Sequence, residues 1–128
     1  MWVLDRARFL RKEADGRMVF LKDLLAKVGL KDDNANYLVE NCYNILSELL
    51  RAKMLQDGYS ASGIGAHEAE VSFMKNLKFP DSDIIFMNDL RYFINGIQYY
   101  EKILDKEYAQ QVLDFMNRIF IKLKKLID

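Results

Sequence analysis

Apolar residues recur every three or four positions along most of the chain, and residues that break helices are few. There is a single proline, Pro80, and there are only six glycines in 128 residues. This spacing is typical of amphipathic helices and not of strands, which alternate with a period of two. The pattern therefore predicts an all-α protein.

The first helical region is expected over about Val3–Val28, with Asp15-Gly16 as a possible interruption. Side chains of Asp32, Asp33 and Asn34 can accept hydrogen bonds from free backbone N–H groups, so they can cap a second helix. That helix is expected to end near Gln56, before Asp57-Gly58. A shorter helix is predicted over roughly His67–Leu77.

Pro80 ends the short helix, and the acidic run Asp81–Asp83 suits the start of a fourth one. Asp105 is expected to separate that helix from the last. The inward-facing seams predicted for the first, second, fourth and last helices are Met18, Leu21, Leu25 and Val28; Leu38, Cys42, Ile45, Leu49 and Ala52; Met87, Leu90, Ile94, Ile97 and Leu104; and Val112, Phe115, Ile119, Leu123 and Leu126. Short connections favour antiparallel neighbours, so we expect residues 1–128 to form one domain, an antiparallel up-down four-helix bundle with an additional short helix.

Charge and cysteine content narrow the function classes. The 19 basic residues balance the 19 acidic ones, which argues against a strong non-specific nucleic-acid binder but leaves room for a local basic groove. The basic run Lys122, Lys124 and Lys125 is expected to be a solvated helix end. Cys42 is the only cysteine, so no intrachain disulfide is possible and no metal ligand set is spaced around it. We expect a cytoplasmic protein without a signal peptide or a membrane span.

A polar and phenolic cluster interrupts the apolar pattern of the fourth helix. Arg91, Asn95 and Gln98 follow one helix face, and Tyr99 and Tyr100 lie beside it. One interpretation is a ligand site for a nucleotide or RNA, with Arg91 on phosphate and tyrosines stacking on a base. The other is a polar stripe at a dimer interface, where Tyr and Arg are enriched.

Two segments carry a family resemblance. In ELLRAKMLQDGYSASGIGAHEAEV, a helix bearing Glu48 and Arg51 ends at Gly58, and a loop then leads to His67 and a short helix. In LRYFINGIQYYE, Asn95 is followed by tyrosines. Together these segments resemble HEPN domains, whose signature helix carries an arginine, an asparagine and, a turn later, a histidine.

The resemblance implies a metal-independent ribonuclease ancestry, with two protomers sharing a cleft along their signature helices. In that cleft the histidine would transfer protons and the arginine would steady the phosphate. Ile94 stands at the arginine position and Tyr99 at the histidine position, while Arg91 lies one turn upstream. We therefore expect a non-catalytic binding or regulatory module without cofactor or metal, paired with a small nucleotidyltransferase.

Two alternatives remain open. The first is a ribonuclease toxin with a rearranged site that uses Arg91 and Tyr99, or His67. The second is a structural helical adaptor with no affinity for nucleotides.

Three further expectations concern single contacts. His67 is the only histidine, and HEAEV lacks the second histidine of a zinc-binding HExxH motif, so we expect His67 to fix the loop before it. Glu48 and Arg51 are spaced to form an ion pair on one helix face. An aromatic strip on the fourth helix is expected to mark a homodimer interface; its members are Tyr92, Phe93, Tyr99 and Tyr100.

Overall fold

The structure is a computed structural model that describes residues 2–59, 65–100 and 104–127, and the surroundings of side chains for residues 3–59, 65–94 and 104–127. It is all-helical over this part of the chain. The five α-helices are α1 (Trp2–Lys27), α2 (Ala35–Gln56), α3 (Ala66–Asn76), α4 (Asp81–Tyr100) and α5 (Lys106–Leu126), and a single 3₁₀ turn, η1 (Asp32–Asn34), precedes α2.

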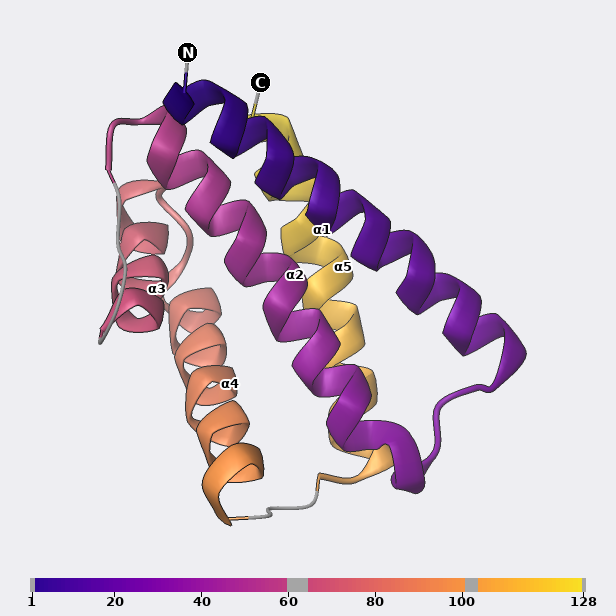
Figure 1. The fold of residues 1–128 in the computed structure, drawn as a ribbon. Coiled ribbons are helices and arrows are strands. Elements are labelled where there is room, and N and C mark those ends of the chain that lie inside the picture. The colour runs from indigo at the N-terminus through magenta and orange to yellow at the C-terminus, as the bar shows by residue number, and fades with distance from the viewer. Residues whose placement is uncertain (1, 60–64, 101–103, 128) are drawn as a thin grey trace.

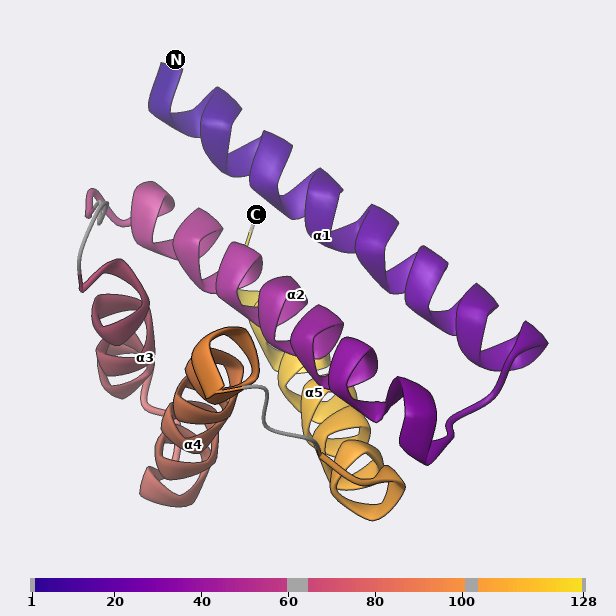
Figure 2. The ribbon, with the colours of Figure 1, turned by 60° about the horizontal axis from the view of Figure 1, so that its bottom comes forward.

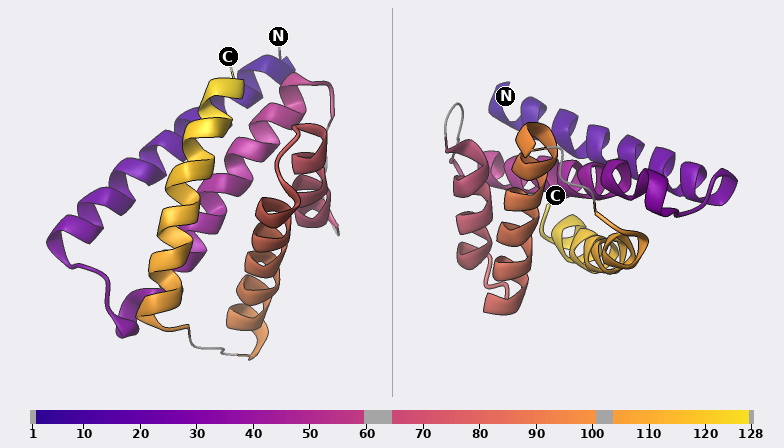
Figure 3. Two further views of the ribbon diagram at one scale, coloured as in Figure 1. Left: turned by 180° about the vertical axis from the view of Figure 1, so that it is seen from behind. Right: turned by 90° about the horizontal axis from the view of Figure 1, so that it is seen from below.

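Helix α2 is the central element (Figure 1). It packs against α1, α3, α4 and α5. Helix α1 runs antiparallel to α2 along one side, whereas α5 lies on another side and runs in the same direction as α2 (Figures 1 and 2). Helices α3 and α4 form a pair that covers the remaining side of α2, as the view from below shows (Figure 3).

The expected seam of α2 is confirmed in full. Leu38, Cys42, Ile45, Leu49 and Ala52 are all at most 1% exposed. The neighbouring side chains Leu46, Leu50 and Met54 are also buried, because α2 has partners on several sides and not on one. A helix that is surrounded in this way needs apolar residues around most of its circumference.

The ends of two other seams differ from expectation. Val28 is 46% exposed because α1 ends at Lys27 and the chain turns away. At the end of α5, Leu126 is 39% exposed and Ile127 is buried in its place. Position 97 lies outside the described side chains, whereas Leu90, Ile94 and Leu104 are buried as expected.

A local signal explains the start of α5, whereas Asn34, which stands at the N-cap of α2, makes no side-chain capping bond, contrary to expectation. The Asp105 carboxylate accepts a hydrogen bond from the Tyr108 backbone N–H at 2.8 Å and so caps α5. Asn36 and Asp32, at the start of α2, accept from the backbone N–H groups of Leu104 and Lys106. These bonds place the first turn of α5 next to the first turn of α2. Asp15-Gly16 does not interrupt α1, which continues through both residues.

Candidate functional site

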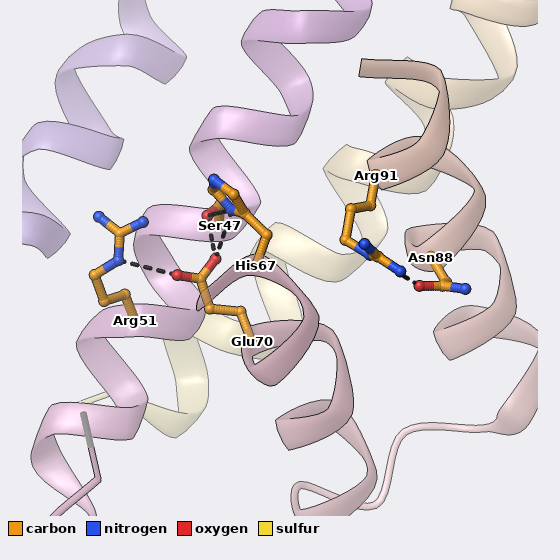
Figure 4. Close-up of polar contacts among 6 residues, drawn as sticks. All are labelled: Ser47, Arg51, His67, Glu70, Asn88 and Arg91. Carbon is orange, nitrogen blue, oxygen red and sulfur yellow. Dashed lines mark hydrogen bonds and ion pairs between the residues drawn. The ribbon is translucent and has the colours of Figure 1, made fainter. Parts of the chain in front are cut away.

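A buried polar cluster lies between α2 and α3 (Figure 4). At its centre is Glu70, which is only 1% exposed. Glu70 Oε2 accepts a hydrogen bond from Arg51 Nε at 3.0 Å. Glu70 Oε1 accepts from Ser47 Oγ and lies 3.2 Å from His67 Nδ1. A carboxylate this deep is tolerated because a cation and further donors satisfy both of its oxygens.

The local sequence explains why these side chains meet. Tyr43, Ser47 and Arg51 are four residues apart and therefore share one face of α2. His67 and Glu70 are three apart in the first turns of α3 and share the face that looks toward α2. Two helix faces are thus joined through one carboxylate.

The cluster fixes the orientation of the His67 ring. An ionised carboxylate only accepts hydrogen bonds, so its position beside the ring favours the tautomer of His67 that carries its hydrogen on Nδ1. Nε2 then bears the lone pair, and the side chain of His67 is 53% exposed. The Nε2 atom of His67 can therefore accept a hydrogen bond or a proton, while the contact between Nδ1 and Glu70 holds the ring in place.

Tyr43 lies under this histidine. The two ring centroids are 5.6 Å apart and the rings are tilted by 56°. The Tyr43 hydroxyl is buried and has no hydrogen-bond partner in the described part of the chain. Burial raises the pKa of Tyr43, the negative charge of Glu70 raises it further, and Arg91 and Arg51 lower it in part. Tyr43 hence remains a neutral phenol within the electrostatic reach of all three charges.

Arg91 lies on α4 within electrostatic reach of Tyr43, and its side chain turns toward Asn88 on the same helix (Figure 4). Its Nε donates to the neutral Asn88 Oδ1 at 3.1 Å, and its guanidinium carbon lies 4.6 Å from the centroid of the Tyr92 ring. Among the described residues no carboxylate pairs with Arg91. Arg91 therefore differs from Arg51, whose charge is neutralised by Glu70.

The expected pair between Glu48 and Arg51 is wrong. Arg51 turns to Glu70 on α3, whereas Glu48 lies on the side of α2 that faces α1, where Arg17 Nε is 2.6 Å from its Oε1. Positions three apart on a helix are close enough to pair, but here each side chain turns to an oppositely charged residue on a different neighbouring helix. Glu48 therefore belongs to the contact between α1 and α2 and not to the candidate site.

The predicted ligand-binding side chains of Asn95, Gln98, Tyr99 and Tyr100 lie outside the described side chains. The structure does describe Ile94, which is buried in the core at 7% exposure. Of the expected aromatic strip, Tyr92 is 60% exposed, while Phe93 is half-buried and packs edge-on against Tyr108 of α5, with ring centroids 5.0 Å apart.

Three further findings concern metal ligands, the single thiol and the character of the helices. No group of three or more His, Cys, Asp or Glu side chains in residues 3–59, 65–94 and 104–127 could hold a metal ion. Burial raises the pKa of the Cys42 thiol to about 12, so this thiol stays protonated and packs as a small apolar group. None of the helices in the described ranges has the length and apolar character needed to span a bilayer.

Burial also raises the pKa of Glu48, with a smaller opposing effect of Arg17. The folded state then binds this proton more tightly than the unfolded state does, so ionisation of Glu48 lowers stability as pH rises above the ordinary glutamate range. In a Glu48→Gln variant this loss is absent. We expect the variant to match the wild type at about pH 3 and to become the more stable of the two toward pH 7. Urea unfolding of both proteins across this range measures the difference, and a relative gain for the wild type with rising pH would contradict it.

Comparisons of the chain with protein-family models, with curated proteins and with solved structures give no match.

Proposed function

We propose that this chain is a HEPN-like binding and regulatory module that holds a phosphate-bearing ligand, a nucleotide or short RNA, without cutting it. In this proposal α1, α2, α4 and α5 correspond to the up-down bundle and α3 to the additional short helix. The module acts in the cytoplasm as a homodimer beside a small nucleotidyltransferase. The HEPN likeness rests on the order of the helices and on the two sequence segments around His67 and Asn95.

One observation carries the ligand class: Arg91 is a guanidinium without a described carboxylate partner, and it lies within electrostatic reach of Tyr43, whose ring packs against that of the half-exposed His67. A guanidinium binds a phosphate in bidentate fashion. The neutral Nε2 of His67 can accept a hydrogen bond from a hydroxyl group, such as that of a ribose. A ligand with a phosphate and a sugar hydroxyl suits both groups, whereas a bare anion suits Arg91 alone.

Burial of Ile94 supports the non-catalytic part of the proposal. At the position where the resemblance calls for an arginine, the side chain packs in the core and brings no charge to the surface. A phosphoryl transition state would then lack a second cation beside Arg91.

The test is a titration of the ¹⁵N-labelled protein with AMP and with a short single-stranded RNA, followed by amide chemical shifts. We expect shifts around His67 and Arg91, and a roughly ten-fold loss of affinity in Arg91→Ala, because a phosphate hydrogen bond to a charged group is worth about 1.5 kcal/mol or more. Arg8→Ala is the matched control, since Arg8 pairs only with the exposed Asp5 on α1. Absence of binding at millimolar ligand would favour the structural adaptor.

A second candidate is a metal-independent ribonuclease of the toxin type. The contact between His67 Nδ1 and the buried Glu70 favours it, because a carboxylate that orients an imidazole leaves Nε2 suited to general acid–base work. This candidate predicts RNA cleavage in the presence of a chelator, growth arrest on expression, and loss of both in His67→Gln. RNA that binds and stays intact supports the binding module. RNA that is cut by the wild type but not by His67→Gln supports the ribonuclease.

A further inference from the structure

A second surface region lies away from His67. It forms where the link between α3 and α4 meets the last turns of α5. A hollow of about 280 Å³ opens there, which is room for one large apolar side chain. Its wall is formed by apolar side chains and by three lysines: Leu77, Phe79, Pro80, Leu126, Lys78, Lys122 and Lys125.

The three lysines differ from Lys124 in their ion pairing. In the described part of the chain none of Lys78, Lys122 and Lys125 has a carboxylate partner. Lys124, in the same helical turn, does: its Nζ donates to both carboxylate oxygens of Asp15 on α1, at 2.6 and 2.8 Å. The lysines of α5 thus divide into one that holds α1 and two that face the hollow. The sequence predicted a solvated helix end for all three lysines in the last turns of α5 and could not distinguish between them.

Lys78 occupies a backbone position that favours glycine. Its φ is 65°, and it is the one non-glycine residue with positive φ in the described chain. It ends α3, with its N–H bonded to the Lys75 carbonyl and the Phe79 N–H bonded to the Met74 carbonyl, a helix ending in which glycine is usual. A lysine here costs conformational free energy, and strained residues of this kind gather at functional surfaces.

We propose that this hollow is a docking site for an acidic segment of a partner protein that carries one large apolar side chain. The apolar side chain fills the space between Phe79 and Leu126, and flanking carboxylates pair with Lys78, Lys122 and Lys125. Lys122 Nζ lies 5.8 Å from the centroid of the Phe79 ring, so a cation stands directly beside the apolar wall. A nucleic-acid backbone would satisfy the charges but leave this apolar wall exposed, which is why the observations favour a protein segment.

The experiment uses a short synthetic peptide with a phenylalanine flanked by glutamates, and a second peptide with serine in place of the phenylalanine. Binding to the ¹⁵N-labelled protein is followed by amide shifts of residues 77–79 and 122–126. We expect the phenylalanine peptide to bind there and the serine peptide to bind roughly ten-fold more weakly, since burial of one large apolar side chain is worth about that factor or more. Equal binding of both peptides, or no shift at millimolar peptide, would overturn the proposal.

Charge-reversal variants distinguish binding at the hollow from general electrostatic attraction between the protein and an acidic peptide. Lys122→Glu/Lys125→Glu is expected to weaken the phenylalanine peptide roughly ten-fold or more, because two ion pairs become repulsive. Lys12→Glu/Lys22→Glu makes the same change of net charge on exposed positions of α1 and should leave affinity nearly unchanged. If both pairs weaken binding equally, the attraction is non-specific and the docking site is refuted.

Lys78→Gly removes one of the three lysines and is expected to leave the protein folded. Glycine adopts the positive φ at lower cost, so the melting temperature is expected to rise while affinity for the peptide falls. A rise in stability with unchanged affinity would remove Lys78 from the site. Vesicles rich in phosphatidylserine and a short single-stranded DNA serve as competing probes. Tighter binding of either than of the peptide would assign the surface to a membrane or to nucleic acid instead.

Discussion

Arg51→Met is expected to cost the folded state about 3 kcal/mol, measured by urea unfolding, because it leaves the Glu70 carboxylate buried without its cation. Methionine keeps the apolar stem of the arginine, so the change removes little packing. Ser47 and His67 still contact Glu70 Oε1, but nothing replaces the bond to Oε2. The same change at Arg8, whose pair with Asp5 is exposed at both ends, should have little effect.

A double-mutant cycle shows whether the loss comes from the stranded charge. Glu70→Gln removes the charge and keeps the shape, so the Arg51→Met/Glu70→Gln variant should be less destabilised than the sum of the two single variants. The interaction term is expected to exceed about 1 kcal/mol for a pair with one fully buried partner. Strict additivity would mean that Arg51 and Glu70 do not stabilise one another and that Glu70 is held by Ser47 and His67.

The helices themselves were predictable because their signals are local. The seam of α2, the stop at Asp57-Gly58 and the cap at Asp105 depend on residues within a few positions of one another. Gly16 misled the prediction since glycine is a weak helix former, yet Ala14 and Met18 on either side are buried against the core and hold α1 continuous. Packing overrides propensity at such a site.

The site was predictable only in part, because its contacts join residues far apart in the chain. Ser47 and Arg51 meet Glu70 across 23 and 19 positions. Spacing of three and four on one helix suggested the Glu48–Arg51 pair, and it could not show that each residue faces a different neighbour. Tyr43 was missed altogether: a tyrosine within an apolar seam gives no sign that its hydroxyl lacks a partner. The one available signal was the spacing of Tyr43, Ser47 and Arg51 on a single face of α2.

A second carboxylate, Asp83 in the first turn of α4, ties that helix to α5. It is 4% exposed, and its two oxygens accept from Arg118 Nη1 at 3.1 Å and Nη2 at 2.8 Å. Hydrogen bonding to Asp83 raises the pKa of Arg118, so the guanidinium keeps its charge. Phe86 and Phe115 pack beside it with ring centroids 4.4 Å apart.

Arg118→Met is therefore expected to destabilise the fold by about 2–3 kcal/mol, less than Arg51→Met, because the start of α4 offers the stranded carboxylate a favourable helix dipole. Arg118→Lys should fall in between, since an ammonium cannot donate to both oxygens in the planar fork of a guanidinium. Hydrogen exchange distinguishes this loss from that at Arg51: the amides of residues 84–90 should exchange faster in Arg118→Met, whereas those of α3 should do so in Arg51→Met. If Arg118→Met left the exchange of α4 unchanged, the ion pair would contribute nothing to its docking, and aromatic contacts such as Phe86 with Phe115 and Phe93 with Tyr108 would have to hold α4 against α5.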